Sequence, residues 1–260
     1  MNQDNHFPAY EKKTVLITVK TYPTPAAKGA EVSCTVGITY EQKWIRLFPI
    51  PFRFMGGDKQ FKKYQWVEVF VKKSSDKRKE SFEVDIDTLN VISEPLSTQK
   101  SWEARKQLIL PLKAPSLCYL QRNRKRTGDT LSIIKPKKVH GFSIEADTPD
   151  WTPEQKAKLL QYSLFDKNPL VPLEKIPYKF SYRFSCDDSN CNGHKLMCTD
   201  WELGASYWKW KRQYGDEWYQ KIINKYDTDM IFKRDIHFFV GTVHGYPRSW
   251  IIIGLFYPPK

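Results

Sequence analysis

The chain has 260 residues, of which 40% are hydrophobic and 15% aromatic, and this composition excludes a disordered tail and is typical of a folded protein. Lysine and arginine number 42 against 29 aspartate and glutamate residues, and the resulting net charge of +13 favours a polyanionic partner, although a generic basic surface is the alternative. No run of about 18 apolar residues occurs and the first residues lack a secretory signal pattern, so we expect a soluble, cytoplasmic protein without membrane contact.

The first ninety residues predict a small β-barrel-like part. Short segments enriched in β-branched and aromatic residues alternate with connections that carry proline or glycine. These segments are residues 14–20, 32–39, 43–48 and 64–71. A helix is predicted over 101–110, ended by Pro111, and a returning strand over 131–145.

The densest basic run of the chain lies between that helix and that strand, in residues 121–129. It carries Arg122, Arg124, Lys125 and Arg126, and we interpret it as a loop. A flexible loop with four cations can contact a phosphate backbone without reading bases. We therefore predict nucleic-acid contacts from these four residues, a solvated basic loop being the alternative.

Residues 146–150, Ala-Asp-Thr-Pro-Asp, predict a domain boundary. It separates a β-rich, barrel-like domain (1–146) from an α+β domain (147–260). In the second domain we expect a helix from Thr152, a strand over 178–184, a helical region over about 200–226 interrupted at Gly215, and a hairpin of two apolar strands, 236–243 and 250–257. The predicted fold class is α+β: a small N-terminal β-barrel-like part, then a mixed α/β part with a metal-stapled β-hairpin.

Three of the five cysteines and one histidine fall within residues 186–198, with the spacing C-x4-C-x2-H-x3-C. Thiolate sulfur and imidazole nitrogen are the ligands that tetrahedral zinc prefers. If residues 194–198 are extended, His194 and Cys198 share one face. We therefore predict a structural zinc ion bound by Cys186, Cys191, His194 and Cys198 at the tip of a hairpin, with free thiols in a polar loop or a disulfide as alternatives.

Asp200 and Glu202 follow this cluster directly. Two neighbouring carboxylates can hold Mg²⁺ for phosphodiester hydrolysis, which makes them the candidate catalytic residues of a nuclease. The structural alternative is a capping box in which Thr199 caps the helix and Glu202 returns the hydrogen bond, and we favour it.

The following helix interleaves aromatic and basic side chains over residues 205–214. Lys209, Lys211 and Arg212 could contact phosphates while rings stack on unpaired bases, although core packing explains most of the rings. The barrel itself contains Trp44, Tyr64 and Trp66, rings that could accept an extruded base.

Five segments resemble a family of uncharacterised bacterial proteins. They are KTYP (20–23), WIRLFPIPFR (44–53), YKFSYRF (178–184), DWE (200–202) and IIGLFYPP (252–259). The resemblance implies a bacterial origin and one continuous protein, but no activity. It also implies that the Asp-Trp-Glu segment is closer to the shared role than the cysteines, which favours the nuclease alternative.

The function predicted from the sequence is nucleic-acid binding, to DNA or RNA, by a protein with a structural zinc site in a prokaryotic DNA-processing or antiviral (phage) defence system. The alternatives are a Mg²⁺-dependent nuclease that uses the two carboxylates, and a protein-interaction subunit whose basic face meets an acidic partner.

Overall fold

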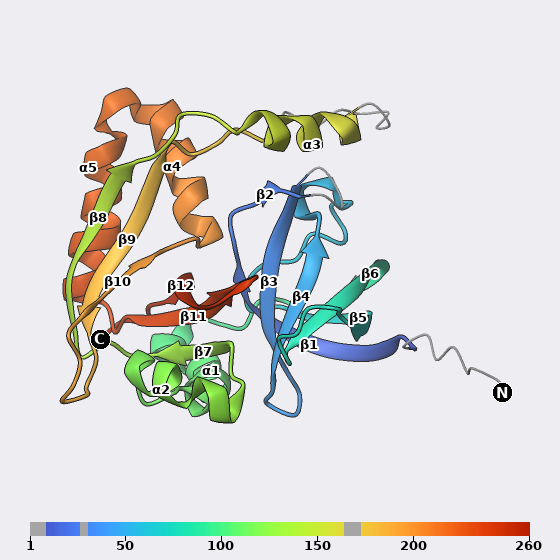
Figure 1. Cartoon of the computed structure of the whole chain (residues 1–260), viewed down its shortest axis with the longest axis horizontal. Coiled ribbons are helices and arrows are strands. Elements are labelled where there is room, and N and C mark those ends of the chain that lie inside the picture. The colour runs from blue at the N-terminus through green and yellow to red at the C-terminus, as the bar shows by residue number, and fades with distance from the viewer. Residues whose placement is uncertain (1–8, 27–30, 164–172) are drawn as a thin grey trace.

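The first part of the chain closes into a five-stranded β-barrel, seen at the right of the computed structural model (Figure 1), which describes residues 9–26, 31–163 and 173–260. The strands follow the order β1-β5-β6-β4-β3, and β3 pairs with β1 to complete the ring. All neighbours are antiparallel except β4 and β6. The strands are β1 (Glu11–Lys20), β3 (Glu31–Thr39), β4 (Trp44–Ile50), β5 (Trp66–Lys73) and β6 (Ser81–Val91), with the short β2 (Thr24–Pro25) beside β3.

Alternation along the strands explains the barrel interior. In β5, Val67, Val69 and Val71 are fully buried, whereas Phe70 between them is exposed, because successive side chains of a strand point to opposite faces. The buried valines pack with apolar side chains of β1 and β4, such as Ile17 and Leu47. The predicted strands of the barrel are confirmed.

The outer face of the barrel is covered where β3 lies. This strand is buried along nearly its whole length, since one face points into the barrel and the other packs on a second sheet. Val36 and Ile38 of β3 pack there with Phe239 and Ile253. That sheet has the order β12-β11-β7 and consists of β7 (Leu131–Ile134), β11 (His237–Val243) and β12 (Tyr246–Phe256).

A third sheet, of order β10-β9-β8, lies at the far side of the molecule from the barrel (Figure 1). Its strands are β8 (Lys138–Ala146), β9 (Tyr178–Ser185) and β10 (His194–Met197). The helices that accompany the two outer sheets are α4 (Trp201–Tyr214), α5 (Trp218–Ile222) and the π-helical segment Ile223–Lys233, whereas α3 (Pro153–Ser163) lies beside β2 (Figure 1). The predicted fold class, a small barrel followed by a mixed α/β part with a Cys/His cluster near a hairpin, is confirmed.

The basic run is a helix, and the predicted loop is wrong. After α1 (Gln99–Ile109), helix α2 spans Leu117–Thr127 and therefore contains the four cations. The Ser116 hydroxyl caps its start by accepting from the backbone N–H of Tyr119 at 2.9 Å, and Gly128 ends it with a positive φ of 68°. Both capping residues can be recognised in the sequence, but the high density of positive charge led to the interpretation of the segment as a loop.

The predicted returning strand over 131–145 is two strands. Pro136 separates β7 from β8, and the two strands enter different sheets: β7 pairs with β11, and β8 pairs with β9. A proline provides no backbone N–H for a ladder, so the strand cannot continue through it. The predicted boundary between residues 146 and 147 lies after both strands, and the division into domains stays a prediction.

Within the described ranges, no helix combines the length and the apolar composition that a membrane crossing requires.

Close packing between α4 and the barrel generates one prediction. A Cβ atom added at the buried Gly204 of α4 would lie 2.3 Å from Cδ2 of Tyr22, which follows β1. We expect Gly204→Ala to lower the free energy of unfolding by about 1–3 kcal/mol, although alanine favours a helix, because the ring must move. Urea unfolding of this variant and of Gly57→Ala, whose added Cβ meets nothing within 4 Å, provides the measurement and the control. Equal stability of the two variants would contradict the packing described here.

Candidate metal centre

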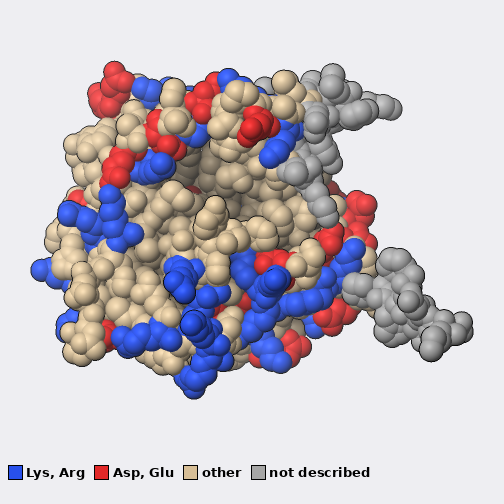
Figure 2. All heavy atoms as spheres, in the orientation of Figure 1, with Lys and Arg blue, Asp and Glu red and all other residues tan. Residues whose placement is uncertain are grey.

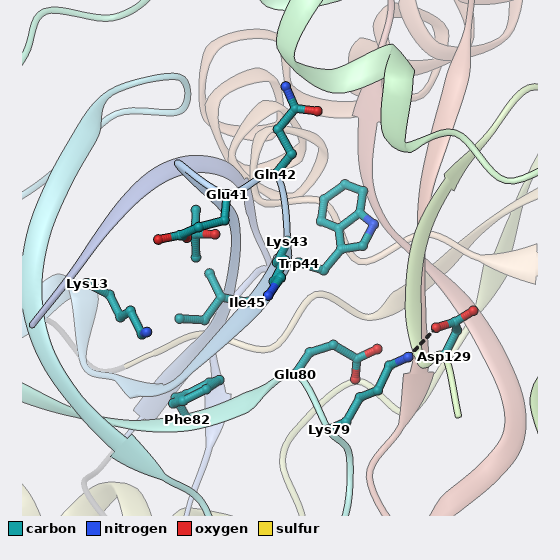
Figure 3. Close-up of a pocket in the computed structure, with 11 residues that line it drawn as sticks. Lys13, Glu41, Gln42, Lys43, Trp44, Ile45, Lys79, Glu80, Phe82 and Asp129 are labelled. Carbon is teal, nitrogen blue, oxygen red and sulfur yellow. Dashed lines mark hydrogen bonds and ion pairs between the residues drawn. The ribbon is translucent and has the colours of Figure 1, made fainter. Parts of the chain in front are cut away.

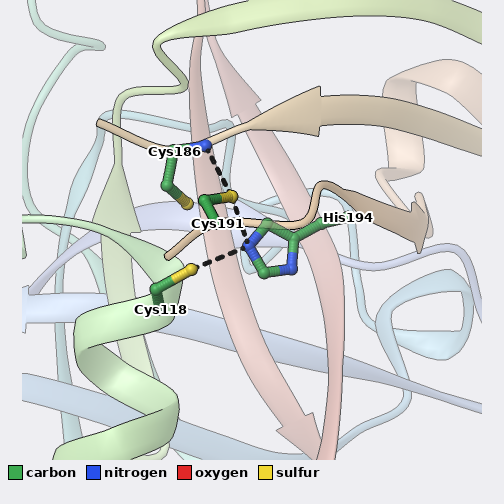
Figure 4. Close-up of side chains that lie close together, drawn as sticks. All are labelled: Cys118, Cys186, Cys191 and His194. Carbon is green, nitrogen blue, oxygen red and sulfur yellow. Dashed lines mark hydrogen bonds between the residues drawn. The ribbon is translucent and has the colours of Figure 1, made fainter. Parts of the chain in front are cut away.

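Four potential metal ligands converge at the end of helix α2 that faces the β9–β10 hairpin. They are the thiols of Cys118, Cys186 and Cys191 and the imidazole of His194 (Figure 4). All four ligand atoms lie within 4.8 Å of one another. The imidazole Nε2 of His194 lies 3.2 Å from Sγ of Cys118 and 3.5 Å from Sγ of Cys191. The group could therefore hold a metal ion.

The donor set and its dimensions fit tetrahedral coordination. Zinc binds sulfur at about 2.3 Å and imidazole nitrogen at about 2.0–2.1 Å, so ligand atoms at the corners of a tetrahedron lie roughly 3.5 Å apart. The two separations from His194 are close to that value. Three thiols and one imidazole form a closed set of four protein ligands, which is the arrangement of structural rather than catalytic zinc sites.

Local structure brings three of the ligands together. Cys186 follows the end of β9, and His194 begins β10. Between them Asp188 forms a tight turn, in which its carbonyl accepts from the backbone N–H of Cys191 at 3.1 Å and its carboxylate accepts from that of Asn190 at 3.1 Å. The backbone N–H of Cys186 then donates to Sγ of Cys191 at 3.1 Å, which orients that thiol toward the centre.

The electrostatics of the cluster suit metal binding. Burial raises the pKa of Cys118 to about 12, and it also raises the pKa of Cys186. Burial opposes ionisation of Cys191 as well, but hydrogen bonds from the N–H groups of Cys186 and Gly193 and from the thiols of Cys118 and Cys186 together outweigh it and lower the pKa of this thiol. Burial lowers the pKa of His194, so its imidazole is neutral at pH 7 and available as a ligand. A bound cation would deprotonate the thiols that burial keeps protonated.

A second contact joins the same two elements. Arg122, one turn beyond Cys118 on α2, forms an ion pair with Asp188 at 2.5 Å. The helix and the hairpin tip are therefore connected both through the cluster and through this pair.

The structure changes one member of the predicted ligand set. Cys186, Cys191 and His194 come together as predicted, but Cys198 lies outside the group and Cys118 stands in its place. His194 and Cys198 are four residues apart on extended chain, which is about 13 Å at a strand rise of roughly 3.3 Å, so they cannot bind one ion. Cys198 is buried instead against Phe180, to whose carbonyl its N–H donates at 2.7 Å. No local pattern reveals Cys118, because it lies 76 residues before His194.

Asp200 and Glu202 form a different cluster, at the joint between the barrel and α4. Asp200, not Thr199, is the N-cap of α4: its Oδ1 accepts from the backbone N–H of Glu202 at 2.7 Å. Its Oδ2 accepts from the backbone N–H of Leu255 at 2.9 Å and from the ammonium of Lys63 at 2.8 Å. Both oxygens of this buried carboxylate are thus engaged, which favours the structural interpretation over a Mg²⁺ site.

The pKa values of two lysines near this cluster, Lys63 before β5 and Lys20 at the end of β1, shift in opposite directions. Burial alone would lower the pKa of Lys63, but the carboxylates of Asp200 and Glu202 raise it above its usual value and keep the amine charged. Burial and the nearby Lys63 lower the pKa of Lys20 to about 7. The Lys20 ammonium lies 3.2 Å from the ring centroid of Phe52, so a ring face provides part of its solvation.

The predicted nucleic-acid contacts fall in two separate places. Arg122, Arg124, Lys125 and Arg126 lie on α2, whereas Lys209, Lys211 and Arg212 lie on α4, at the opposite edge of the molecule in Figure 1. On α2 the side chains of Arg122, Lys125 and Arg126 are exposed, and Arg124 is half-buried. On α4, Lys209 and Arg212 are exposed, and Lys211 pairs with Asp216 at 2.8 Å. The two groups are not one continuous surface.

The metal centre predicts that Cys118, and not Cys198, is needed for metal. We expect the protein purified from cells to contain one metal ion per chain and Cys118→Ala to contain less than about a tenth of that, because three ligands bind a structural ion poorly. Elemental analysis by mass spectrometry measures the content. Cys198→Ala is the matched control and should keep its metal; loss of metal from this variant with retention in Cys118→Ala would restore the ligand set predicted from the sequence.

The contacts of Asp200 predict that its substitution lowers the stability of the protein and that the carboxylate has no catalytic role. Asp200→Asn leaves the ammonium of Lys63 buried with its closest carboxylate partner gone, so we expect the free energy of unfolding to fall by about 3 kcal/mol. Denaturant unfolding gives the value, and Asp216→Asn, which removes the fully exposed partner of Lys211, should be close to neutral. An Asp200→Asn variant of normal stability would contradict a structural role for this carboxylate.

The comparisons with known proteins give two matches. Residues 113–260 match a profile described as a domain of unknown function (DUF8757), and residues 11–111 match another, also described as a domain of unknown function (DUF8758). The search of curated proteins found no match. The first profile covers the metal centre and more than half of the sequence, and the chain therefore belongs to the DUF8757 family.

Proposed function

We propose that this protein binds nucleic acid through helix α2, and that a structural zinc ion fixes this helix to the β9–β10 hairpin. The observation that carries the proposal is the position of Cys118, which places one of the four potential ligands in the first turn of the helix with the densest basic run. The metal centre and the basic segment, which are separate in the sequence, are thus parts of one unit.

The burial pattern of α2 supports a projecting role for its second half. Its buried residues, Leu117, Cys118 and Leu120, all lie in the first turn or next to it. Among the following residues the side chains of Lys125 and Arg126 are exposed, whereas Asn123, Arg124 and Thr127 are half-buried. One of the four potential ligands, Cys118, lies in this first turn, so a bound ion would attach the helix there, while Lys79 contacts its last residue, Thr127. The C-terminal end of α2, which carries Lys125 and Arg126, is then exposed to solvent.

Charge around α2 supports a polyphosphate partner. Figure 2 shows Lys and Arg side chains gathered over the part of the surface where Figure 1 draws α2. The connection between β7 and β8 adds Lys135 and Lys137, and β8 begins with Lys138. All three are exposed, although Lys135 and Lys137 pair with Asp235 and Asp187. Such an excess of cations releases counterions from a phosphate backbone on binding and speeds association.

Zinc is the metal that the donor set favours. Three sulfurs and one nitrogen are softer than the oxygen sites that Mg²⁺ or Ca²⁺ require, and a closed tetrahedron leaves no position for a substrate. We therefore assign the ion a structural role. Thiolate ligands of this kind need a reducing compartment, and the proposal accordingly places the protein in the cytoplasm.

The other functions predicted from the sequence find less support. A Mg²⁺-dependent nuclease needs carboxylate oxygens free for metal, and those of Asp200 are engaged by Lys63 and by two backbone N–H groups. A protein-interaction subunit with a basic face would use the same cations on α2, so the binding experiment must decide between the two partners. A role in prokaryotic DNA processing or antiviral defence stays a prediction.

The proposed contact predicts a change in salt dependence. We expect the double variant Lys125→Ala/Arg126→Ala to bind a 20-base-pair duplex roughly tenfold more weakly at 0.2 M salt than the wild type, and the slope of log K against log salt to become shallower by about 1.8, because two phosphate contacts are lost. Fluorescence anisotropy titrations at four salt concentrations measure both quantities.

The matched control for this experiment removes the same charge from α4. Lys209→Ala/Arg212→Ala should change the affinity and the slope much less, since these cations lie at the other edge of the molecule. Equal effects of the two double variants would show a diffuse attraction without a defined contact on α2. No binding of DNA or RNA at 0.05 M salt would overturn the proposed function and favour an acidic protein partner.

A further inference from the structure

The barrel has a cavity at the end that faces α2. Its volume is about 580 Å³, and it is lined by the β3–β4 turn, by the starts of β1 and β6, and by the connection that follows α2 (Figure 3). Trp44, Ile45 and Phe82 form its apolar walls, with Trp44 and Phe82 on opposite sides in this view. A cavity of this size and lining suits a flat, ring-shaped ligand with a few polar edges.

The two rings are fixed by contacts outside the cavity. Trp44 packs edge-on against Phe239 of β11, with ring centroids 6.1 Å apart. The ammonium of Lys73 lies 4.6 Å from the ring centroid of Phe82. Both walls are therefore in place before any ligand arrives, which lowers the entropic cost of binding.

The buried polar groups of the wall are engaged within the protein. The hydroxyl of Thr39 is buried and lowers the pKa of the exposed Glu41 carboxylate by donating a hydrogen bond to it. The other buried polar residue of the cavity, Glu80, is fully engaged: its two oxygens accept from the N–H and the hydroxyl of Thr130 at 3.0 and 2.7 Å. Neither side chain therefore needs a ligand as a partner, and the aromatic walls supply the attraction.

The cavity opens beside the basic end of α2. Lys79, on its rim, donates to the carbonyl of Thr127, the last residue of the helix, at 2.9 Å and pairs with Asp129 at 2.6 Å. Phosphates held by Lys125 and Arg126 would therefore lie close to the mouth. A nucleic-acid strand whose phosphates lie along α2 would bring its bases to this point. The positive charge beside the cavity favours a nucleotide over an uncharged aromatic metabolite as its ligand.

We propose that this cavity binds one unpaired nucleobase of a nucleic acid whose phosphates contact α2. The inference rests on the proposed function and adds a base-binding site to it. Ring stacking on Trp44 and Phe82 supplies the attraction. The cavity replaces the set of rings suggested by the sequence, since Tyr64 is buried in the core beneath Arg105, and Trp66 stacks on Tyr40 outside this cavity.

The test uses two single strands of equal length and charge. One is a 12-nucleotide DNA of mixed sequence, and the other is the same sugar-phosphate backbone without bases. We expect the wild type to bind the strand with bases roughly tenfold more tightly, because stacking is lost with the bases. Phe82→Leu, which keeps an apolar side chain but removes the ring, should reduce this preference to less than about threefold and leave affinity for the base-free strand unchanged.

Phe70→Leu is the matched control, because Phe70 is an exposed ring of the same barrel that does not line the cavity. It should retain the full preference of the wild type. Trp44→Leu is the second variant if Phe82→Leu does not fold, and circular dichroism checks the fold of each.

The outcomes separate the two proposals. A wild type that binds both strands equally, or a Phe82→Leu variant with an undiminished preference, overturns the base site and leaves the phosphate contact standing. A wild type that binds neither strand, nor duplex DNA or RNA, overturns the proposed function and the base site together.

Discussion

The arrangement of the whole molecule depends on one buried negative charge, the carboxylate of Asp200. It caps α4 through the N–H of Glu202, fixes β12 through the N–H of Leu255 and neutralises Lys63. A helix, a strand and the segment that precedes β5 therefore meet at a single group. None of the three could lose this partner without leaving a buried donor unsatisfied, so the orientation of the barrel relative to the outer sheets is strongly determined.

The Cys/His cluster plays the corresponding role for α2. Both helices are attached by their first turns: α4 by an ion pair and hydrogen bonds, and α2 by potential metal ligands together with the Arg122–Asp188 pair. The difference lies in burial. The Asp200 joint is closed inside the protein, whereas the Cys/His cluster includes the half-buried Cys191 and His194 and lies beside the exposed cations of α2.

A third connection links α2 to the barrel and explains why the cavity lies where it does. Glu80, at the start of β6, binds Thr130, and the guanidinium of Arg46 in β4 points to the carbonyl of Thr130 at 3.4 Å. The chain after α2 is thus fixed against the barrel end by buried polar contacts. Consequently the basic end of the helix and the mouth of the cavity are fixed relative to each other, which the proposed shared binding surface would require.

The sequence by itself determined four of the five barrel strands, the hairpins and three of the four potential ligands, because these follow from local patterns, whereas β6 (Ser81–Val91) was not predicted. Val67, Val69 and Val71 alternate with the period of a strand, and Cys186, Cys191 and His194 lie within one turn of chain, where spacing limits their separation. The sequence also carried the caps of α2, Ser116 and Gly128, but the interpretation of the basic run as a loop passed over them.

Only the tertiary structure decided the fourth ligand, the N-cap role of Asp200 and the walls of the cavity. Cys118 reaches the cluster because α2 packs against the hairpin, and no spacing rule connects it with a histidine 76 residues later. Lys63 meets Asp200 across 137 residues for the same reason. Local pattern sets which elements form and which faces are apolar, whereas contacts between distant segments depend on how those faces pack, and that information is spread over the whole chain.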